Sequence, residues 1–152
     1  LMDRLGVKTS FLKNSAILTK QTHQQTIDWN FTDCPDLAQT ALPVCAAKGI
    51  TGTFTGMESL RIKETDRIEA LQTELAKIGA RLDEDAGTWK LFPSKEIKKE
   101  KISIATYHDH RMAMGFAPLA TLFDVEIETP EVVNKSYPGF WNDMKSVGFE
   151  II

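Results

Sequence analysis

A cluster of charged residues, Lys63-Glu64-Thr65-Asp66-Arg67, stands where a loop leads into a predicted helix. Lys63 and Arg67 are four residues apart, so on a helix they share one face. Helix starts usually prefer acidic residues, because the helix dipole is positive at that end. Two cations beside free backbone N–H groups therefore favour an anion site. Glu64 can instead pair with Arg67, and an ordinary salt-bridged helix start is the alternative interpretation.

A second cluster, His108-Asp109-His110-Arg111, opens a segment whose next residues are small or apolar. Two imidazoles and a guanidinium at a helix start suit an anion or a proton relay. His108 and His110 are only two residues apart and lack a supporting ligand pattern, so we expect no metal site. Taken alone, the cluster is more typical of a surface helix cap.

Two weaker signals precede other predicted helices, namely Asn134-Lys135-Ser136-Tyr137-Pro138 and the carboxylate of Asp36 directly after Pro35. A single lysine before a helix is weak evidence for an anion site. Asp36 taken alone is more typical of an acid that interacts with a helix dipole. All four sites nevertheless lie at helix starts, and the helix starts of repeated α/β units can face one cleft. Such convergence would suit a phosphate-bearing substrate.

The elements that must position these residues alternate between strands and helices. Strands are expected where polar and apolar residues alternate, and helices where an apolar stripe lies between capping signals. The expected strands are 7–12, 16–19, 26–31, 51–56, 80–83, 88–92, 102–105, 125–129 and 149–152, and the expected helices are 37–48, 63–78, 110–122 and 137–147. Loops are expected at 57–62 and 95–101.

The resulting order is β-α-β-α-β-β followed by β-α-β-α-β, which predicts an internal repeat of structure. We therefore expect an α/β fold of repeated βαβαββ units with mixed sheets, because two of the strand pairs are hairpins. The expected parts are 1–20, the tail of an earlier repeat; 21–93, a complete repeat; and 94–152, the last repeat. Residues 1–6 are typical of a helix end closed by glycine. This favours a chain cut from a longer protein over one that opens with a short helix.

The composition excludes several other classes of protein. The formal net charge is −3, whereas nucleic-acid binders usually carry a basic excess. No apolar run approaches the roughly 20 residues that span a bilayer, and no signal peptide is visible. Cys34 and Cys45 are 11 residues apart and fit a reduced, cytoplasmic protein better than a disulfide framework. We expect neither nucleic acid nor membrane as a partner.

Two long segments resemble the signatures of one family. Leu60-Arg61-Ile62-Lys63-Glu64-Thr65-Asp66-Arg67 and Thr106-Tyr107-His108-Asp109-His110-Arg111-Met112-Ala113-Met114 are similar to those of the 5-enolpyruvylshikimate-3-phosphate (EPSP) synthases. Pro35-Asp36 and the segment 134–138 fall at matching places. The resemblance covers nearly the whole chain, and it implies two domains of βαβαββ units with the ligands between them. This chain would be roughly the last third of such an enzyme.

The resemblance implies transfer of the enolpyruvyl group of phosphoenolpyruvate to the 5-hydroxyl of shikimate 3-phosphate, with release of phosphate and no cofactor. It makes Asp36 a proton acceptor near that hydroxyl, Lys63 a shikimate-side contact that assists proton transfer, and Glu64 an acid/base at the methylene carbon. By the same resemblance, the residues that bind phosphoenolpyruvate are Arg67, Arg111 and Lys135, with His110 close by. Carboxylates, lysine and guanidinium groups suit this proton transfer and anion binding.

Ser59 is a departure from the family pattern, because some relatives have an asparagine at this position. A serine hydroxyl still forms a hydrogen bond, with shorter reach, so Ser59 is a candidate contact to the shikimate hydroxyls. The related transferase that acts on a UDP-sugar is one alternative function. A stand-alone anion-binding module is another, of a different class. The missing N-terminal part would be the main partner, and the isolated chain is expected to fold without catalysing.

Overall fold

The computed structural model describes residues 1–63, 65–95 and 101–152. In chain order the strands are β1 (Val7–Phe11), β2 (Ala16–Lys20), β3 (Thr26–Asn30), β4 (Thr51–Thr55), β5 (Arg81–Asp85), β6 (Thr88–Phe92), β7 (Ile102–Ile104) and β8 (Val125–Ile127). The α-helices are α1 (Ala38–Ala47), α2 (Arg67–Lys77), α3 (His110–Phe116) and α4 (Phe140–Ser146). Short 3-10 helices are η1 (Pro35–Leu37), η2 (Glu58–Ile62), η3 (Ala117–Thr121) and η4 (Pro130–Lys135).

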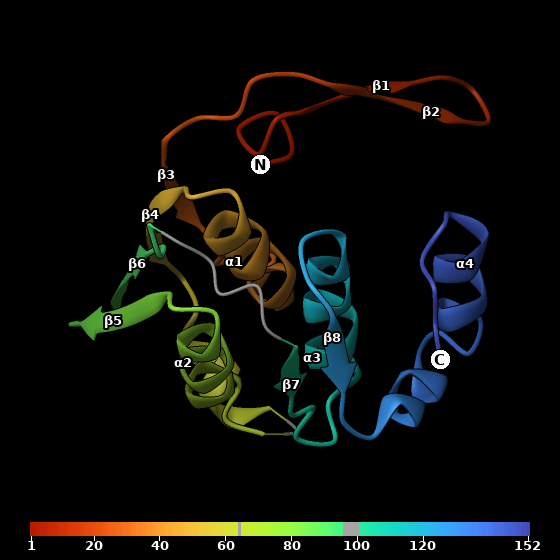
Figure 1. The fold of residues 1–152 in the computed structure, drawn as a ribbon. Coiled ribbons are helices and arrows are strands. Elements are labelled where there is room, and N and C mark those ends of the chain that lie inside the picture. Colours follow the sequence, from red (N-terminus) through yellow and green to blue (C-terminus); the bar gives the residue numbers. More distant parts are fainter. Residues whose placement is uncertain (64, 96–100) are drawn as a thin grey trace.

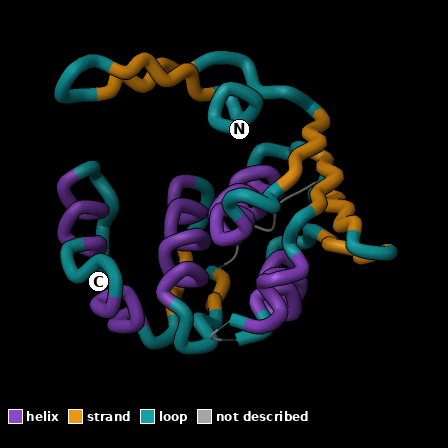
Figure 2. The backbone as a smooth tube through the Cα atoms, turned by 180° about the vertical axis from the view of Figure 1, so that it is seen from behind, coloured by secondary structure: helices purple, strands orange, loops and turns teal. Residues whose placement is uncertain are grey.

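The first hairpin extends away from the helices, as Figures 1 and 2 show from opposite sides. Strands β1 and β2 pair antiparallel, as the sequence predicts, and Val7 lies opposite Lys20. A turn over residues 2–6 precedes the hairpin and ends at Gly6, whose φ of 91° lies in the region that favours glycine. Every residue of β2 is exposed, so this hairpin contributes little to the core.

The central sheet has the strand order β3-β4-β6-β5. Strands β3 and β4 run parallel, whereas β6 pairs antiparallel with both β4 and β5. The two residues between β5 and β6, Ala86 and Gly87, have φ values of 48° and 75°. Positive φ at both positions is what a tight two-residue hairpin turn requires. The expected mixed α/β fold with mixed sheets is therefore confirmed.

A parallel pair, β7 and β8, forms a separate sheet, and Ile102 lies opposite Val125. The helix between these strands, α3, packs against α1, which lies between β3 and β4 in the chain (Figure 1). Core side chains come from both parts of the structure, among them Phe54, Trp89, Met112 and Phe116, all with no exposed surface. Packing of α1 on α3 thus joins the four-stranded sheet to the β7–β8 pair.

A glycine allows the close approach of α1 and α3. A Cβ on Gly115 would lie 2.2 Å from the carbonyl oxygen of Gln39, so only glycine fits without movement of backbone. Pro43 lies inside α1, four residues after Gln39, and has no N–H with which to bond that carbonyl. Proline on one helix and glycine on the other therefore set the distance between the two helices.

Gly115→Ala is expected to lower the free energy of unfolding by about 1–3 kcal/mol, as overpacking of a core contact does. Urea unfolding of the chain measures this change. Gly139→Ala is the matched control, because its Cβ would meet nothing closer than 3.7 Å. The control should change stability by no more than about 0.5 kcal/mol. Equal effects at the two positions would contradict the close helix contact.

Several predicted boundaries are wrong. The helix predicted for 63–78 begins only at Arg67, because the Asp66 side chain accepts from the N–H groups of Ile68 and Glu69. The helix predicted for 110–122 is α-helical only to Phe116, since Pro118 has no N–H to continue it, and 3-10 helix η3 follows. The loop predicted for 57–62 contains the 3-10 helix η2.

The C-terminal elements also differ from expectation. The helix predicted for 137–147 is α4, which is shorter, and Gly148 follows with a φ of 103°. The strand predicted for 149–152 is not formed, because these residues pair with no other strand in the described part of the chain. Within the described residues, none of the helices combines the length and apolar character needed to cross a bilayer.

Candidate anion-binding site at the helix starts

Asp36 is the centre of the charged cluster. Pro35 begins η1, five residues after the last residue of β3, and holds Asp36 at the entrance to α1. The carboxylate contacts three cations: Oδ1 lies 2.8 Å from Nη1 of Arg67 and Oδ2 lies 3.0 Å from Nη2 of Arg111. The third cation is Lys63, whose Nζ lies 3.8 Å from Oδ1. The three cations come from the starts of two helices and the loop before one of them.

Arg67 also binds a second carboxylate. Its Nε donates to Oδ2 of Asp109 at 2.6 Å, and the two side chains are 2% and 0% exposed. Arg67 therefore bridges Asp36 at the surface and Asp109 in the interior. A buried guanidinium between two carboxylates is held in one orientation, because Nε and Nη1 donate to two different carboxylates.

Asp109 also fixes the start of α3. Its Oδ1 accepts from the backbone N–H of Arg111 at 2.8 Å, as the sequence predicts for a helix cap. Its Oδ2 also accepts from Nε2 of Gln39 at 3.3 Å, which ties α3 to α1. The sequence does not predict a role for Gln39, and it predicts Asp109 only as a helix cap. The available signal for Gln39 is its long polar side chain in a largely apolar helix, 38–47.

The anion site inferred at the start of α2 needs correction. Lys63 precedes the helix and lies in extended backbone at the end of η2, so it does not share a helix face with Arg67. The N–H groups of Ile68 and Glu69 already bind the Asp66 side chain. Side-chain cations, rather than free N–H groups, therefore supply the positive charge beside Asp36.

A second buried acid positions the loop before α3. Glu74, on α2, accepts from the hydroxyl of Tyr107 at 2.8 Å and from the N–H of Ala105 at 3.2 Å. Burial and the neighbouring Glu74 raise the pKa of Tyr107 to about 12. Tyr107 and His108 both have positive φ, 53° and 57°, a conformation that costs energy for such residues. Glu74 thus anchors a strained loop that leads into Asp109.

The other site residues predicted from the sequence are His110, Lys135, Ser59 and Glu64. His110 is 9% exposed, and its Nδ1 lies 3.8 Å from Oδ1 of Asp109. Lys135 is the last residue of η4, which packs against α3, the helix that carries Arg111. Ser59 is exposed on η2, before Lys63. Glu64 lies outside the described residues.

The geometry suits binding of an anionic ligand. Among the described residues, three cations (Lys63, Arg67 and Arg111) meet two carboxylates (Asp36 and Asp109). Arg111 and Lys63 have 34% and 35% of their side chains exposed, so a ligand can reach them. In the described part of the chain, no group of three or more His, Cys, Asp or Glu side chains is arranged to hold a metal ion.

The fold and this cluster define a mixed α/β protein with a cation-rich site at converging helix starts. Comparison with known families shows to which family this chain belongs. The family model described as EPSP synthase (3-phosphoshikimate 1-carboxyvinyltransferase) matches residues 1–144, so the chain belongs to this family.

Individual relatives agree with this assignment. A 3-phosphoshikimate 1-carboxyvinyltransferase of Bacteroides fragilis strain YCH46 is 44% identical over 151 residues, which cover 97% of this chain and 37% of the relative. A chloroplastic enzyme of the same name from Arabidopsis thaliana is 33% identical over 156 residues, 97% of this chain and 29% of the relative. The chain therefore spans only about a third of the length of these relatives.

A solved structure shares the fold. The EPSP synthase of Acinetobacter baumannii matches 97% of this chain and 37% of its own with a TM-score of 0.69 at 20% sequence identity. At this identity the likeness bears on the fold alone. It supports the mixed α/β fold with mixed sheets described above.

Proposed function

We propose that this chain forms the C-terminal part of a 3-phosphoshikimate 1-carboxyvinyltransferase. The complete enzyme would move the enolpyruvyl group of phosphoenolpyruvate to the 5-hydroxyl of shikimate 3-phosphate and release phosphate. The observation that carries this proposal is the meeting of Lys63, Arg67 and Arg111 at Asp36. These residues come from motifs far apart in the sequence, and the family match supports the substrate class.

Phosphoenolpyruvate would bind to the cations that now contact Asp36. Its carboxylate and phosphate suit the paired donors of Arg67 and Arg111, with Lys135 on the neighbouring η4 and His110 beside them. Arg111 and Lys63 are accessible, whereas Arg67 is 2% exposed and doubly paired. The incoming anion would therefore displace Asp36 mainly from Arg111 and Lys63, while Arg67 keeps its orientation on Asp109.

Displacement of Asp36 would free a carboxylate for the second substrate. We assign to Asp36 the acceptance of the proton of the 5-hydroxyl, with Lys63 assisting on the shikimate side. Ser59 would donate a hydrogen bond to a shikimate hydroxyl. Glu64 would protonate the methylene carbon and take the proton back at elimination. Fixed cations stabilise the charge that develops in both steps.

The rest of the same protein would supply the opposite wall of the site. Within this chain we propose the divisions 1–20, 21–93 and 94–152, which are the tail of an earlier unit, a complete unit and the last unit. We propose a cytoplasmic enzyme whose ligands are the two small anionic substrates. Neither nucleic acid, nor membrane, nor a cofactor has a role in the proposed reaction.

Phosphate release by the full-length protein tests this proposal. Release should require phosphoenolpyruvate together with shikimate 3-phosphate. UDP-N-acetylglucosamine, the acceptor of the related cell-wall enzyme, should give no release. Phosphate release with UDP-N-acetylglucosamine and not with shikimate 3-phosphate would show that the proposed acceptor is wrong. Binding of phosphoenolpyruvate and shikimate 3-phosphate without phosphate release would favour an anion-binding module.

Arg111→Ala in the full-length protein is expected to raise the KM for phosphoenolpyruvate by about tenfold or more, because a charged hydrogen bond contributes about 1.5–3 kcal/mol. Steady-state phosphate release measures KM. Arg81→Ala is the matched control, since this exposed guanidinium pairs with the exposed carboxylate of Asp83. An unchanged KM in the Arg111 variant would show that Arg111 does not bind phosphoenolpyruvate.

A further inference from the structure

A strained turn joins β7 to α3. Within it, the N–H of Asp109 donates to the carbonyl of Thr106 at 2.8 Å. The two residues between them, Tyr107 and His108, have φ values of 53° and 57°, although neither is glycine. Such conformations cost energy, and they persist only where surrounding contacts hold them. The turn therefore depends on contacts from outside the loop.

Glu74 of α2 supplies these contacts. Its Oε1 accepts from the hydroxyl of Tyr107 at 2.8 Å, and its Oε2 accepts from the N–H of Ala105 at 3.2 Å. Burial and Glu74 raise the pKa of Tyr107 to about 12, so the hydroxyl stays protonated and remains a donor at neutral pH. Nζ of Lys77 lies 2.7 Å from Oε2 of Glu74 and donates to the carbonyl of Ser103 at 2.9 Å. The Glu74 side chain has no exposed surface, so its charge is fixed between the turn and Lys77.

The same face of α2 also holds the far end of the turn. Arg67 and Glu74 are seven residues apart, which is about two helical turns and roughly 10 Å along the helix. Nε of Arg67 donates to Asp109 at the end of the turn, whereas Glu74 binds Tyr107 within it. Helix α2 therefore holds the segment 105–109 at two points.

Arg111 lies two residues after this turn. Oδ1 of Asp109 accepts from the N–H of Arg111 at 2.8 Å, which ties the position of Arg111 to the turn. Nη1 of Arg67 and Nη2 of Arg111 lie 2.8 Å and 3.0 Å from the two oxygens of Asp36. The distance between the two guanidinium groups thus matches a single carboxylate. Because charged hydrogen bonds need defined geometry, a shift of the turn would weaken the joint binding of an anion.

We propose that Glu74 and Tyr107 are positioning residues of the phosphoenolpyruvate site. Through the turn, they hold Arg111 at the distance from Arg67 at which both guanidinium groups bind one anionic group of the substrate. Neither Glu74 nor Tyr107 touches the substrate or takes part in proton transfer. The inference rests on the proposed function, and it adds to that function the residues that set the spacing of its two arginines.

Tyr107→Phe in the full-length protein tests this role, because phenylalanine keeps the ring and loses only the hydroxyl that Glu74 binds. The dissociation constant for phosphoenolpyruvate, measured by equilibrium titration without shikimate 3-phosphate, should rise about three- to tenfold, the contribution of one hydrogen bond. In steady-state assays the KM for phosphoenolpyruvate should rise similarly, while kcat changes by less than about twofold. An unchanged dissociation constant would overturn the proposal.

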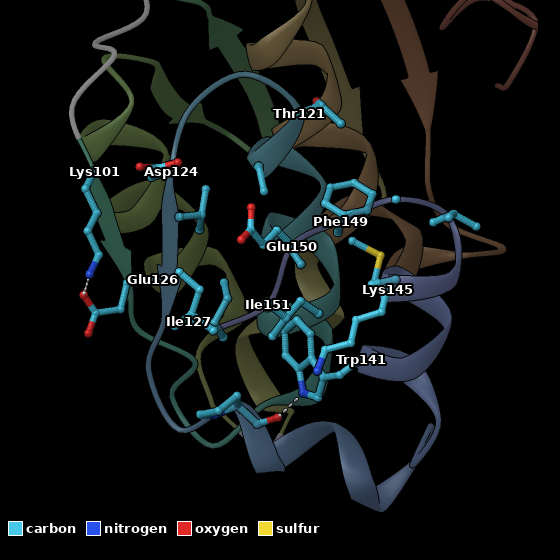
Figure 3. A pocket seen from close by; sticks show the side chains of 18 residues that line it. Lys101, Thr121, Asp124, Glu126, Ile127, Trp141, Lys145, Phe149, Glu150 and Ile151 are labelled. Carbon is cyan, nitrogen blue, oxygen red and sulfur yellow. Dashed lines mark hydrogen bonds and ion pairs between the residues drawn. The ribbon is translucent and has the colours of Figure 1, made fainter.

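Tyr137→Phe is the matched control. It also removes a tyrosine hydroxyl that donates to a carboxylate, in this case that of Asp143 on α4. With Trp141, α4 lines a separate groove of about 960 Å³, and neither Glu74 nor Tyr107 borders that groove (Figure 3). The control should therefore leave the dissociation constant for phosphoenolpyruvate unchanged. Equal increases in the two tyrosine variants would contradict the positioning role.

The Arg111→Ala background separates positioning from general stability. Once Arg111 is replaced, Tyr107→Phe has no guanidinium left to position, so the double variant should bind phosphoenolpyruvate as weakly as Arg111→Ala alone. A purely structural role would weaken binding by the same factor in both backgrounds, and that result would overturn the proposal. Glu74→Gln should show the same dependence on Arg111, because glutamine keeps only one of the two acceptor oxygens. If Glu74→Gln fails to fold, the Tyr107 variants still decide the question.

The binding measurement also separates this inference from the proposed reaction. Binding of phosphoenolpyruvate without phosphate release would contradict the reaction, and the two Tyr107 backgrounds would still test the positioning role. Turnover by the wild-type protein, together with an unchanged dissociation constant in Tyr107→Phe, would contradict the positioning role alone. A wild-type protein that does not bind phosphoenolpyruvate would overturn both.

Discussion

Glu64→Gln in the full-length protein is expected to lower kcat by about 100- to 10 000-fold, the range that a positioned acid or base contributes. Glutamine keeps the size and polarity of the side chain but cannot exchange a proton with the methylene carbon. The KM for each substrate changes less, because a group that acts in the transition state affects mainly kcat. Steady-state phosphate release separates the two parameters.

Glu69→Gln is the matched control for this variant. It makes the same chemical change five residues later, on the exposed side of α2. Its kcat should equal that of the unmodified protein. An unchanged kcat in the Glu64 variant would show that the acid/base assignment is wrong, whatever the effect on KM.

Asp109→Asn is expected to lower the free energy of unfolding by about 3 kcal/mol, the lower end of the cost of breaking a buried ion pair. Asparagine still caps α3, so the change isolates the charge that faces Arg67. The cost stays at the lower end because Asp36 continues to bind Arg67 at 2.8 Å. Urea unfolding monitored by circular dichroism measures the loss.

Two further variants make this test specific. Asp83→Asn removes a carboxylate from an exposed pair with Arg81 and should cost no more than about 1 kcal/mol. Combining Asp109→Asn with Arg67→Met should recover part of the loss, because no unpaired charge then remains in the interior. A loss below about 1 kcal/mol for Asp109→Asn alone would contradict a buried pair of this strength.

Local chemistry explains which elements the sequence predicted well. The hairpin of the expected strands 80–83 and 88–92 and the cap at Asp109 are short-range features, and both are present, although β5 extends to Asp85 and leaves a turn of only Ala86-Gly87. The start of α2 was predicted too early because Lys63 and Glu64 suit a helix. The competing cap by Asp66 decides the boundary through two hydrogen bonds that involve only neighbouring residues.

The site depends on contacts that sequence spacing does not encode. Gln39 and Asp109 are 70 residues apart, and they meet because Gly115 lets α3 approach the backbone of α1. The charged motifs indicated that Arg67 and Arg111 bind an anion. They did not indicate that Asp36 is the anion both contact in this structure. The strand predicted for 149–152 is not formed for a similar reason: a strand needs a partner strand beside it, and sequence spacing does not encode that contact.

Phosphate release by the isolated 152-residue chain, compared with the full-length protein, tests most directly whether this cluster is one wall of a two-walled site. Holding two substrates in reactive geometry can contribute about 7–11 kcal/mol, and cations facing open solvent cannot supply it alone. The full-length protein should release phosphate from phosphoenolpyruvate plus shikimate 3-phosphate. The isolated chain should show only weak, salt-sensitive binding of phosphoenolpyruvate near Arg67 and Arg111. Turnover by the isolated chain at a rate near that of the full-length protein would contradict the account.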